Sequence, residues 1–330
     1  MIPLNSRDRP KLPKYKDKAK GRNILIYTIQ AISSKQLKKG IIKLSGTEIL
    51  IKTKVNPARI CQVRLVPKCD SYVIEVIYDE PESTVSNDIW GASIDLGLNN
   101  LVALTSNQPG FIPLLINGRP LKSINQFYNK RSSHLQSQLK GSRKSSPRIQ
   151  RLTRCRNQKV DNYLHHASRL IIGILVAKQI GTLVIGKNAH WKTEIDLGKQ
   201  TNQNFVGIPH ARLIQMIEYK ARLVGMKVIV QEESYTSRSN FLNLDPIPVY
   251  GHTGADDVTF SGKRIKRGLY KTSVGQSINS DVNASYNILR KAIPNAFSDG
   301  IESCVVQPRR VNPLKVKVKG EGLNASHARS

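Results

Sequence analysis

An alternation of strand-like and helix-like segments between residues 161 and 231 most constrains the fold of this chain. Residues 161–180 carry apolar side chains on one helical face, and residues 182–186 form a short apolar run that is typical of a buried strand. A second helix is predicted from residue 209 to about residue 224, followed by a second apolar strand over residues 226–231. Strands separated by helices are typical of an α/β sheet with crossover connections, so we predict an α/β fold for this region.

An acidic stretch that contains proline separates this region from a different pattern nearer the amino terminus. Residues 23–80, which precede this stretch, show the pattern of short strands and turns. The clearest strand among them is the nearly continuous apolar and aromatic run at residues 72–78. A change of composition at a polar stretch is typical of a domain boundary. The predicted parts are a basic arm (1–22), a partial β-rich domain (23–80), a linker (81–88), an α/β domain (89–297) with a basic helical insertion (121–180) and a basic loop (234–280), and a disordered tail (298–330).

Acidic residues stand at the ends of predicted elements in the α/β domain. An apolar strand ends at Asp95 and is followed by Gly97, where the backbone can turn sharply or approach a ligand closely. Glu232 and Glu233 follow a second strand, and Asp281 begins a predicted helix, whose dipole favours a carboxylate there. Carboxylates gathered at one point repel one another unless cations neutralise them. The pattern therefore indicates a metal site.

The charge of the chain indicates a polyanionic partner. Lys and Arg number 52 against 23 acidic residues, which gives a formal charge of +29. Such an excess favours nucleic acid through counterion release and electrostatic steering. A membrane surface is the competing polyanion, but no stretch has the roughly 18 continuous apolar residues of a spanning helix, and no signal peptide is evident. We expect a cytoplasmic protein that binds nucleic acid, without a membrane partner. A metal site in such a protein indicates cutting of a phosphate backbone.

Two basic clusters are the candidate phosphate contacts. Ten Lys or Arg residues and no acid lie between residues 130 and 160, with a break predicted near Pro147. A solvated helical hairpin is the alternative interpretation, although such hairpins usually carry compensating acids. The candidate nucleic-acid-binding residues are Lys130, Arg131, Lys140, Arg143, Lys144, Arg148, Arg151 and Arg154, together with Lys263, Arg264, Lys266 and Arg267.

The cysteines do not indicate a metal or disulfide framework. The four of them are scattered, none forms a Cys-x-x-Cys pair, and no histidine stands at ligand spacing from a cysteine. We therefore predict no zinc site.

Three motifs in order resemble a known family. They are Ser93-Ile94-Asp95-Leu96-Gly97-Leu98-Asn99-Asn100-Leu101, Glu233-Ser234-Tyr235-Thr236-Ser237 and Asp281-Val282-Asn283-Ala284-Ser285-Tyr286-Asn287-Ile288. Together they resemble the RuvC-type nuclease motifs of the TnpB (OrfB) proteins of bacterial insertion sequences. The resemblance extends from about residue 10 to residue 297.

This resemblance implies an RNase H-like fold that carries a magnesium-dependent, RNA-guided DNA endonuclease, related to type V CRISPR effectors. It implies a site of two Mg²⁺ ions, guide RNA and target DNA as partners, and a wedge-like role for the β-rich domain. Asp95 and Asp281 match the first and third acids of the family. The strand that usually carries the second acid has Gly186 in its place, and Glu233 fits a position on the next strand, with Glu232 as the alternate.

Two departures from the family leave alternatives open. The loop after Ser237 lacks the cysteines of a zinc ribbon, and the chain starts late by family standards, inside the wedge-like region. A truncated or degenerate relative that binds RNA or DNA without cleaving is therefore the first alternative. A transposase that joins DNA ends and a basic structural protein are the others. The family also implies action alongside a separate tyrosine transposase, while the oligomeric state stays open.

Overall fold

The computed structural model describes residues 21–81, 83, 89–188, 207–252, 257–266, 268–318 and 323–325. These residues form two compact units, and each is described by itself. The first unit contains the described residues up to Glu80 and a short segment, Ser145–Arg154. The second unit contains the remainder of the described chain. The predicted basic arm falls almost entirely outside the described residues, as does most of the predicted linker.

The first unit is built on antiparallel strands. Its three-stranded sheet has the order β1-β4-β5, and a separate hairpin pairs β2 with β3. Seven buried apolar side chains, among them Ile42, Leu44 and Val63, form its core. The elements are β1 (Leu25–Thr28), η1 (Ile29–Ala31), α1 (Ser34–Leu37), β2 (Ile41–Lys43), β3 (Leu50–Lys52), η2 (Pro57–Arg59), β4 (Ile60–Lys68) and β5 (Ser71–Tyr78).

A six-stranded mixed sheet organises the second unit. The strands β10, β9 and β6 are parallel, β7 is antiparallel to both β6 and β8, and β14 is parallel to β8. In order across the sheet the strands are β10 (Lys227–Gln231), β9 (Thr182–Gly186), β6 (Gly91–Leu96), β7 (Asn100–Ser106), β8 (Leu114–Asn117) and β14 (Arg309–Val311). The two strands of the predicted strand–helix–strand alternation, β9 and β10, thus lie side by side at one edge of a single sheet.

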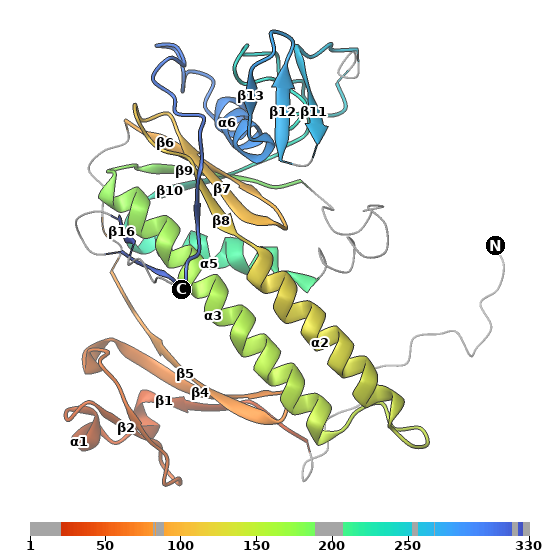
Figure 1. Cartoon of the computed structure of the whole chain (residues 1–330). Coiled ribbons are helices and arrows are strands. Elements are labelled where there is room, and N and C mark those ends of the chain that lie inside the picture. The colour runs from red at the N-terminus through yellow and green to blue at the C-terminus, as the bar shows by residue number, and fades with distance from the viewer. Residues whose placement is uncertain are drawn as a thin grey trace, which may run out of the picture. The chain divides into compact units, whose positions relative to one another are not determined.

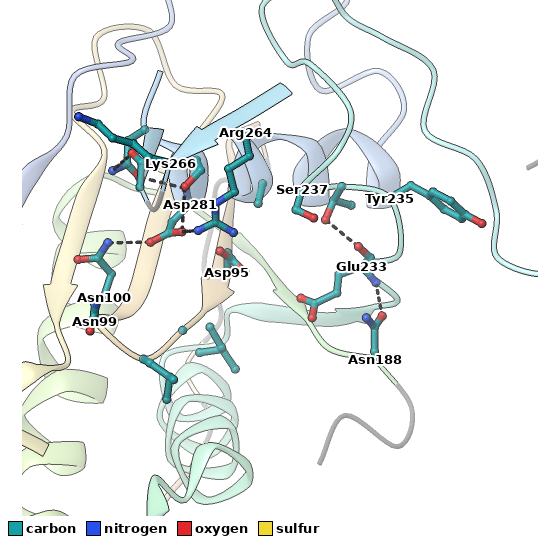
Figure 2. Close-up of a pocket in the computed structure, with 18 of the residues that line it drawn as sticks. Asp95, Asn99, Asn100, Asn188, Glu233, Tyr235, Ser237, Arg264, Lys266 and Asp281 are labelled. Atoms are coloured by element: carbon teal, nitrogen blue, oxygen red, sulfur yellow. Dashed lines mark hydrogen bonds and ion pairs between the residues drawn. The ribbon is translucent and has the colours of Figure 1, made fainter. Parts of the chain in front are cut away.

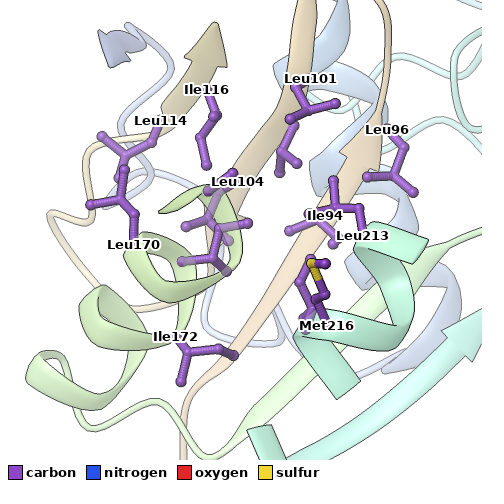
Figure 3. Packing of buried hydrophobic residues seen from close by; sticks show 14 of the residues in the cluster. Ile94, Leu96, Leu101, Leu104, Leu114, Ile116, Leu170, Ile172, Leu213 and Met216 are labelled. Carbon is purple, nitrogen blue, oxygen red and sulfur yellow. The ribbon is translucent and has the colours of Figure 1, made fainter. Parts of the chain in front are cut away.

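Helices cover both faces of this sheet (Figure 1). On one face, α3 (Pro147–Ala177) and α5 (His210–Leu223) pack onto it, and on the other lies α6 (Ser280–Ala292). Side chains alternate between the faces along each strand, so Ile94 and Leu96 enter the large core beneath α3 and α5. Figure 3 shows this packing. By the same alternation, Ser93 and Asp95 face α6, and this places the carboxylate outside the apolar core.

Two helices begin earlier than the sequence predicts. The helix α2 (Arg119–Ser137) starts ahead of residue 121, where the helical insertion is predicted to begin, and α3 starts at Pro147 rather than at residue 161. Proline fits the first turn of a helix, because the backbone N–H that it lacks would have no partner there. Pro147 therefore marks the start of the long helix as well as the predicted break. Within the described residues no helix is both long and apolar enough to span a membrane.

Two predictions of irregular structure were wrong in part. The basic loop 234–280 contains a three-stranded antiparallel sheet of β11 (Gly262–Lys266), β12 (Leu269–Thr272) and β13 (Ser277–Ile278). The tail 298–330 contributes β14 to the main sheet, and its further strands, β15 (Val316–Val318) and β16 (Leu323–Ala325), pair with each other. These strands have two to five residues, which is too short for a clear period-2 pattern.

Candidate active site

Asp95 lies where two strands of the sheet separate. The strand β6 pairs with β9 only as far as Ile94, whereas Asp95 still pairs with Ala103 of β7. The backbone at Asp95 is therefore held on one side and free on the other. Its carboxylate lines a cavity of 1080 Å³ on the α6 side of the sheet.

Asp281 reaches the same cavity from the first turn of α6. Asn279 caps this helix, because its side chain accepts hydrogen bonds from the backbone N–H groups of Asp281 and Val282. The Asp281 carboxylate accepts a hydrogen bond from Asn100 Nδ2 at 2.7 Å. It also forms an ion pair with Arg264 at 3.9 Å, and Figure 2 shows both contacts.

A buried cluster of hydroxyl groups holds α6 over the strand that carries Asp95. Ser93 Oγ donates to the backbone oxygen of Ser285 at 2.6 Å, and the Ser285 hydroxyl lies 2.9 Å from that of Thr105. All three side chains are fully buried. Because Ser93 and Ser285 stand near Asp95 and Asp281 in sequence, this contact fixes the two acids relative to each other.

Two buried asparagines on α6 hold the segment that follows Glu233. Asn283 Nδ2 donates to the backbone oxygen of Ser239 at 2.8 Å, and its Oδ1 accepts from the N–H of Phe241. Asn287 Nδ2 donates to the backbone oxygens of Thr236 and Ser239 at 3.0 and 2.7 Å. The polar residues of the Asp281 motif therefore connect α6 to both other acidic segments.

Glu233 follows β10 and points into the cavity (Figure 2). Its backbone N–H donates to Asn188 Oδ1 at 2.9 Å. Its Oε2 is buried and has no hydrogen-bond partner among the described residues. A Cβ atom on Gly186 would lie 2.6 Å from that oxygen and 2.5 Å from Ile288 Cδ1. The glycine on β9 therefore leaves the space that the Glu233 carboxylate fills.

Glu232, the alternate, is engaged elsewhere. Its carboxylate accepts a hydrogen bond from Lys291 Nζ at 2.6 Å and another from the N–H of Ser234. Glu232 is absent from the lining of the cavity, to which Glu233 contributes. Burial disfavours ionisation of Glu232, but the hydrogen bonds from Lys291 and Ser234 outweigh it and lower the pKa of its carboxyl.

Burial and neighbouring negative charges disfavour the ionised forms of Asp95 and Glu233. Burial, followed by repulsion from Glu233 and Asp281, holds the pKa of Asp95 well above its ordinary value, and Arg264 opposes this effect. Burial and the charge of Glu232 raise the pKa of Glu233 to about 7. A cation that binds next to these carboxyl groups would stabilise their ionised forms.

Among the described residues, four cationic side chains line the cavity that holds the acids. Arg264 and Lys266 extend from β11, Arg119 from the start of α2 and Arg310 from β14, and all four are exposed. The acids thus occupy the floor of a cavity whose rim is positive, and such a rim favours a phosphate-bearing ligand.

The donor set of this cavity fits Mg²⁺ held partly by water. In the described part of the chain, no three acidic, histidine or cysteine side chains stand close enough to hold one ion by themselves. Mg²⁺ usually keeps several waters and binds one or two carboxylates. The buried, unpartnered oxygens of Glu233 and Asn100 are acceptors that such a hydrated cation would satisfy.

Most of the predicted nucleic-acid-binding residues are exposed. Arg154 is the exception, because it is half-buried and pairs with Asp70 at 2.6 Å. Arg267 falls outside the described residues. The exposed candidates are Lys130 and Arg131 on α2, Lys140, Arg143 and Lys144 in the connection after it, Arg148 and Arg151 on α3, and Lys263, Arg264 and Lys266 on β11. Of these, Arg264 and Lys266 reach the acid cavity.

Sequence reasoning missed Asn100, Arg119, Asn188 and Arg310 as residues of this cavity. The doubled Asn99-Asn100 after the Asp95 strand was a usable signal, because small polar residues after a strand often line a site. The other three stand in segments that are far apart in sequence and carry no shared pattern.

Comparisons with known proteins agree with the motifs. The family model OrfB_IS605, described as a probable transposase, matches residues 72–192, and that of the Cas12f1-like TNB domain matches residues 210–288. The TnpB-like protein ORF457 of Acidianus two-tailed virus is 25% identical over 237 residues, which cover 68% of this chain and 47% of that protein. The chain therefore spans about half the length of this curated relative.

Two solved structures are also similar to this chain. One is a Cas12f1–sgRNA–target DNA complex, with a TM-score of 0.44 and 16% identity over 68% of this chain and 55% of that one. The other is a CRISPR-Cas12f ternary complex, with the same TM-score and identity over 69% of this chain and 45% of that one. Taken together, the two family models and the viral relative support the TnpB/OrfB family for this chain.

Proposed function

We propose that this chain is a metal-dependent, RNA-guided DNA endonuclease whose catalytic carboxylates are Asp95, Glu233 and Asp281. The observation that carries the proposal is the convergence of these three carboxylates on one cavity with a cationic rim. Similarity to the TnpB/OrfB family supports guide RNA and target DNA as the partners, and the net charge of +29 supports a polyanion.

Glu233 rather than Glu232 is proposed as the second acid. Its unpartnered Oε2 and the space left by Gly186 support this choice. Glu232 has its own cationic partner in Lys291. A carboxylate that is already neutralised by a lysine gains less from a metal than one that has no partner.

The acids would hold two Mg²⁺ ions, which supply activation of a water and stabilisation of the leaving oxygen when they are bound. Asn100 orients Asp281 through its 2.7 Å hydrogen bond. Arg264 neutralises Asp281 at 3.9 Å and would turn to a phosphate when a strand enters the cavity. The exposed Lys and Arg residues of α2 and the start of α3 would bind phosphates without reading sequence.

The test begins with co-expression of the protein and the DNA that flanks its gene, followed by sequencing of the RNA that co-purifies. A DNA duplex that matches this RNA is then incubated with the complex and Mg²⁺. We expect cleavage by the parent and by Glu232→Gln at comparable rates, and none by Glu233→Gln.

Equal cleavage by both variants would refute the assignment of Glu233. A defined bound RNA without any Mg²⁺-dependent cleavage by the parent would refute the nuclease proposal. That result would favour the alternative of a relative that binds nucleic acid without cutting it.

A further inference from the structure

The strand β14 brings a segment from beyond α6 back to the main sheet. Arg309 N–H donates to the backbone oxygen of Pro113 at 2.8 Å, and Arg309–Val311 pairs in parallel with Leu114–Ile116. Val311 is buried in the core beneath α3 and α5. The segment before the strand is also anchored, because Tyr286 of α6 donates a hydrogen bond to the backbone oxygen of Val305 at 2.8 Å.

The alternation of side chains places Arg310 on the α6 face of the sheet. Its partner in the register, Leu115, packs with the cluster that contains Tyr286 of α6, whereas Val311 packs into the opposite core. Arg309 therefore faces away from α6. The two neighbouring arginines have the same charge and are both exposed, but they belong to opposite faces.

Arg310 lies where two cavities adjoin. It lines the acid cavity of 1080 Å³ and also a second cavity of 410 Å³, and Gly268 and Asn279 line both as well. Gly268 has a φ of +78° in the turn between β11 and β12, a conformation that L side chains rarely adopt. Gly268 places no side chain between the two cavities that it lines.

The chemistry of this boundary suits a phosphodiester. Within the described residues Arg310 forms no ion pair. Its guanidinium could therefore bind a phosphate without first breaking a contact with a carboxylate. Besides Arg310 and Gly268, the second cavity is lined by the uncharged polar residues Ser277, Asn279 and Gln307 and by the apolar residues Leu115, Leu269, Ile278 and Pro308. Arg310 is the one cationic residue among those described that lines both cavities, so a nucleic-acid strand that passes from the acids into the second cavity would meet its guanidinium.

We propose that Arg310 binds a phosphate of the cleaved strand next to the one that is hydrolysed, and that the strand leaves the acids through the second cavity. This inference rests on the proposed nuclease function. The guanidinium would donate two parallel hydrogen bonds to the phosphate oxygens, a geometry that a lysine cannot supply.

The test measures kcat and KM for DNA cleavage by the complex with its co-purified RNA. We expect Arg310→Gln to lower kcat/KM by about 10- to 100-fold, as loss of a charged hydrogen-bonded contact does. Arg309→Gln is the matched control, and we expect it to stay within about twofold of the parent, as surface substitutions usually do. Arg310→Lys should restore activity only in part.

A chemical change in the substrate locates the contact. A neutral methylphosphonate is placed at each phosphate that flanks the cut, one at a time, and tested with each variant. At one of these positions the replacement should slow the parent and Arg309→Gln but cause no further loss in Arg310→Gln, because the two partners of one contact are not additive.

The outcomes separate this inference from the proposed function. If Arg310→Gln cleaves like Arg309→Gln while Asp95→Asn is inactive, the Arg310 inference is overturned and the nuclease stands. A loss in Arg310→Gln that is additive with every methylphosphonate also overturns it. If Asp95→Asn cleaves as fast as the parent, the proposed function fails and the inference falls with it.

Discussion

Gly186→Ala tests the way in which the sheet accommodates Glu233. The new Cβ would lie 2.6 Å from Glu233 Oε2 and 2.5 Å from Ile288 Cδ1, and both distances are far below ordinary contact. Ile288 is fully buried, so it has little room to move. Overpacking of this kind usually costs about 1–3 kcal/mol in the free energy of unfolding. The carboxylate must also turn away from its present place.

The measurement is urea denaturation followed by tryptophan fluorescence. The chain has two tryptophans, of which Trp191 falls outside the described residues. Trp90 belongs to the second unit, so its signal reports on the unit that carries the substitution. We expect Gly186→Ala to lower the free energy of unfolding by about 1–3 kcal/mol and to raise the Mg²⁺ concentration required for cleavage.

Two further variants separate the packing effect from the displacement of the carboxylate. Ile288→Val removes the Cδ1 atom, so Gly186→Ala combined with Ile288→Val should regain stability relative to Gly186→Ala without regaining the Mg²⁺ response. Gly91→Ala is the matched control on β6, because the nearest atoms to its Cβ would be the side-chain ends of Ile293 and Leu289, at 3.2 and 3.3 Å, with Asn107 Oδ1 at 3.9 Å. Parental stability and an unchanged Mg²⁺ response in Gly186→Ala would refute the reasoning.

Two other predictions concern stability. Because the pKa of Glu233 is raised to about 7, the folded metal-free protein holds a proton that the unfolded chain releases at lower pH, so stability should fall as the pH rises through about 7. Glu233→Gln should remove up to about 3 kcal/mol of that loss in the free energy of unfolding. The measurement compares the urea midpoints of parent and variant at pH 5 and pH 8 in the presence of a chelator, and an equal pH dependence in the two proteins would contradict this prediction. Asn287→Leu should cost about 2–4 kcal/mol, because it leaves the backbone oxygens of Thr236 and Ser239 without this donor. An unchanged urea midpoint would show that these hydrogen bonds do not hold the segment.

The elements with a strong periodic pattern were predictable from sequence. The apolar runs at residues 91–96, 182–186 and 227–231 form strands of one sheet, and the helices between them pack where their apolar faces predict. By contrast, β11 has four exposed residues out of five and carries lysine and arginine. Its pairing with β12 depends on hydrogen bonds between backbones, which leave little trace in the sequence.

Adjacent acids show the limit of sequence reasoning at the site. Glu232 and Glu233 stand side by side, so their spacing to other motifs cannot separate them. Two tertiary features distinguish them. Lys291, one residue before the end of α6, neutralises Glu232, and Gly186 on a neighbouring strand makes room for Glu233. The buried roles of Asn283 and Asn287 were likewise invisible, because their partners are backbone oxygens and N–H groups of a distant segment.

The most direct test of the central claim is Mg²⁺-dependent cleavage of a matching DNA duplex by the RNA-loaded parent and by Asp95→Asn, with RNA binding measured on the same preparations. Asp95 lies on β6 and lines the acid cavity, whereas most of the candidate phosphate-binding residues lie on α2, on the start of α3 and in the connection between these helices. We predict that Asp95→Asn abolishes cleavage and leaves RNA binding close to that of the parent. Cleavage by Asp95→Asn at the rate of the parent would contradict the assignment of this cavity as the active site.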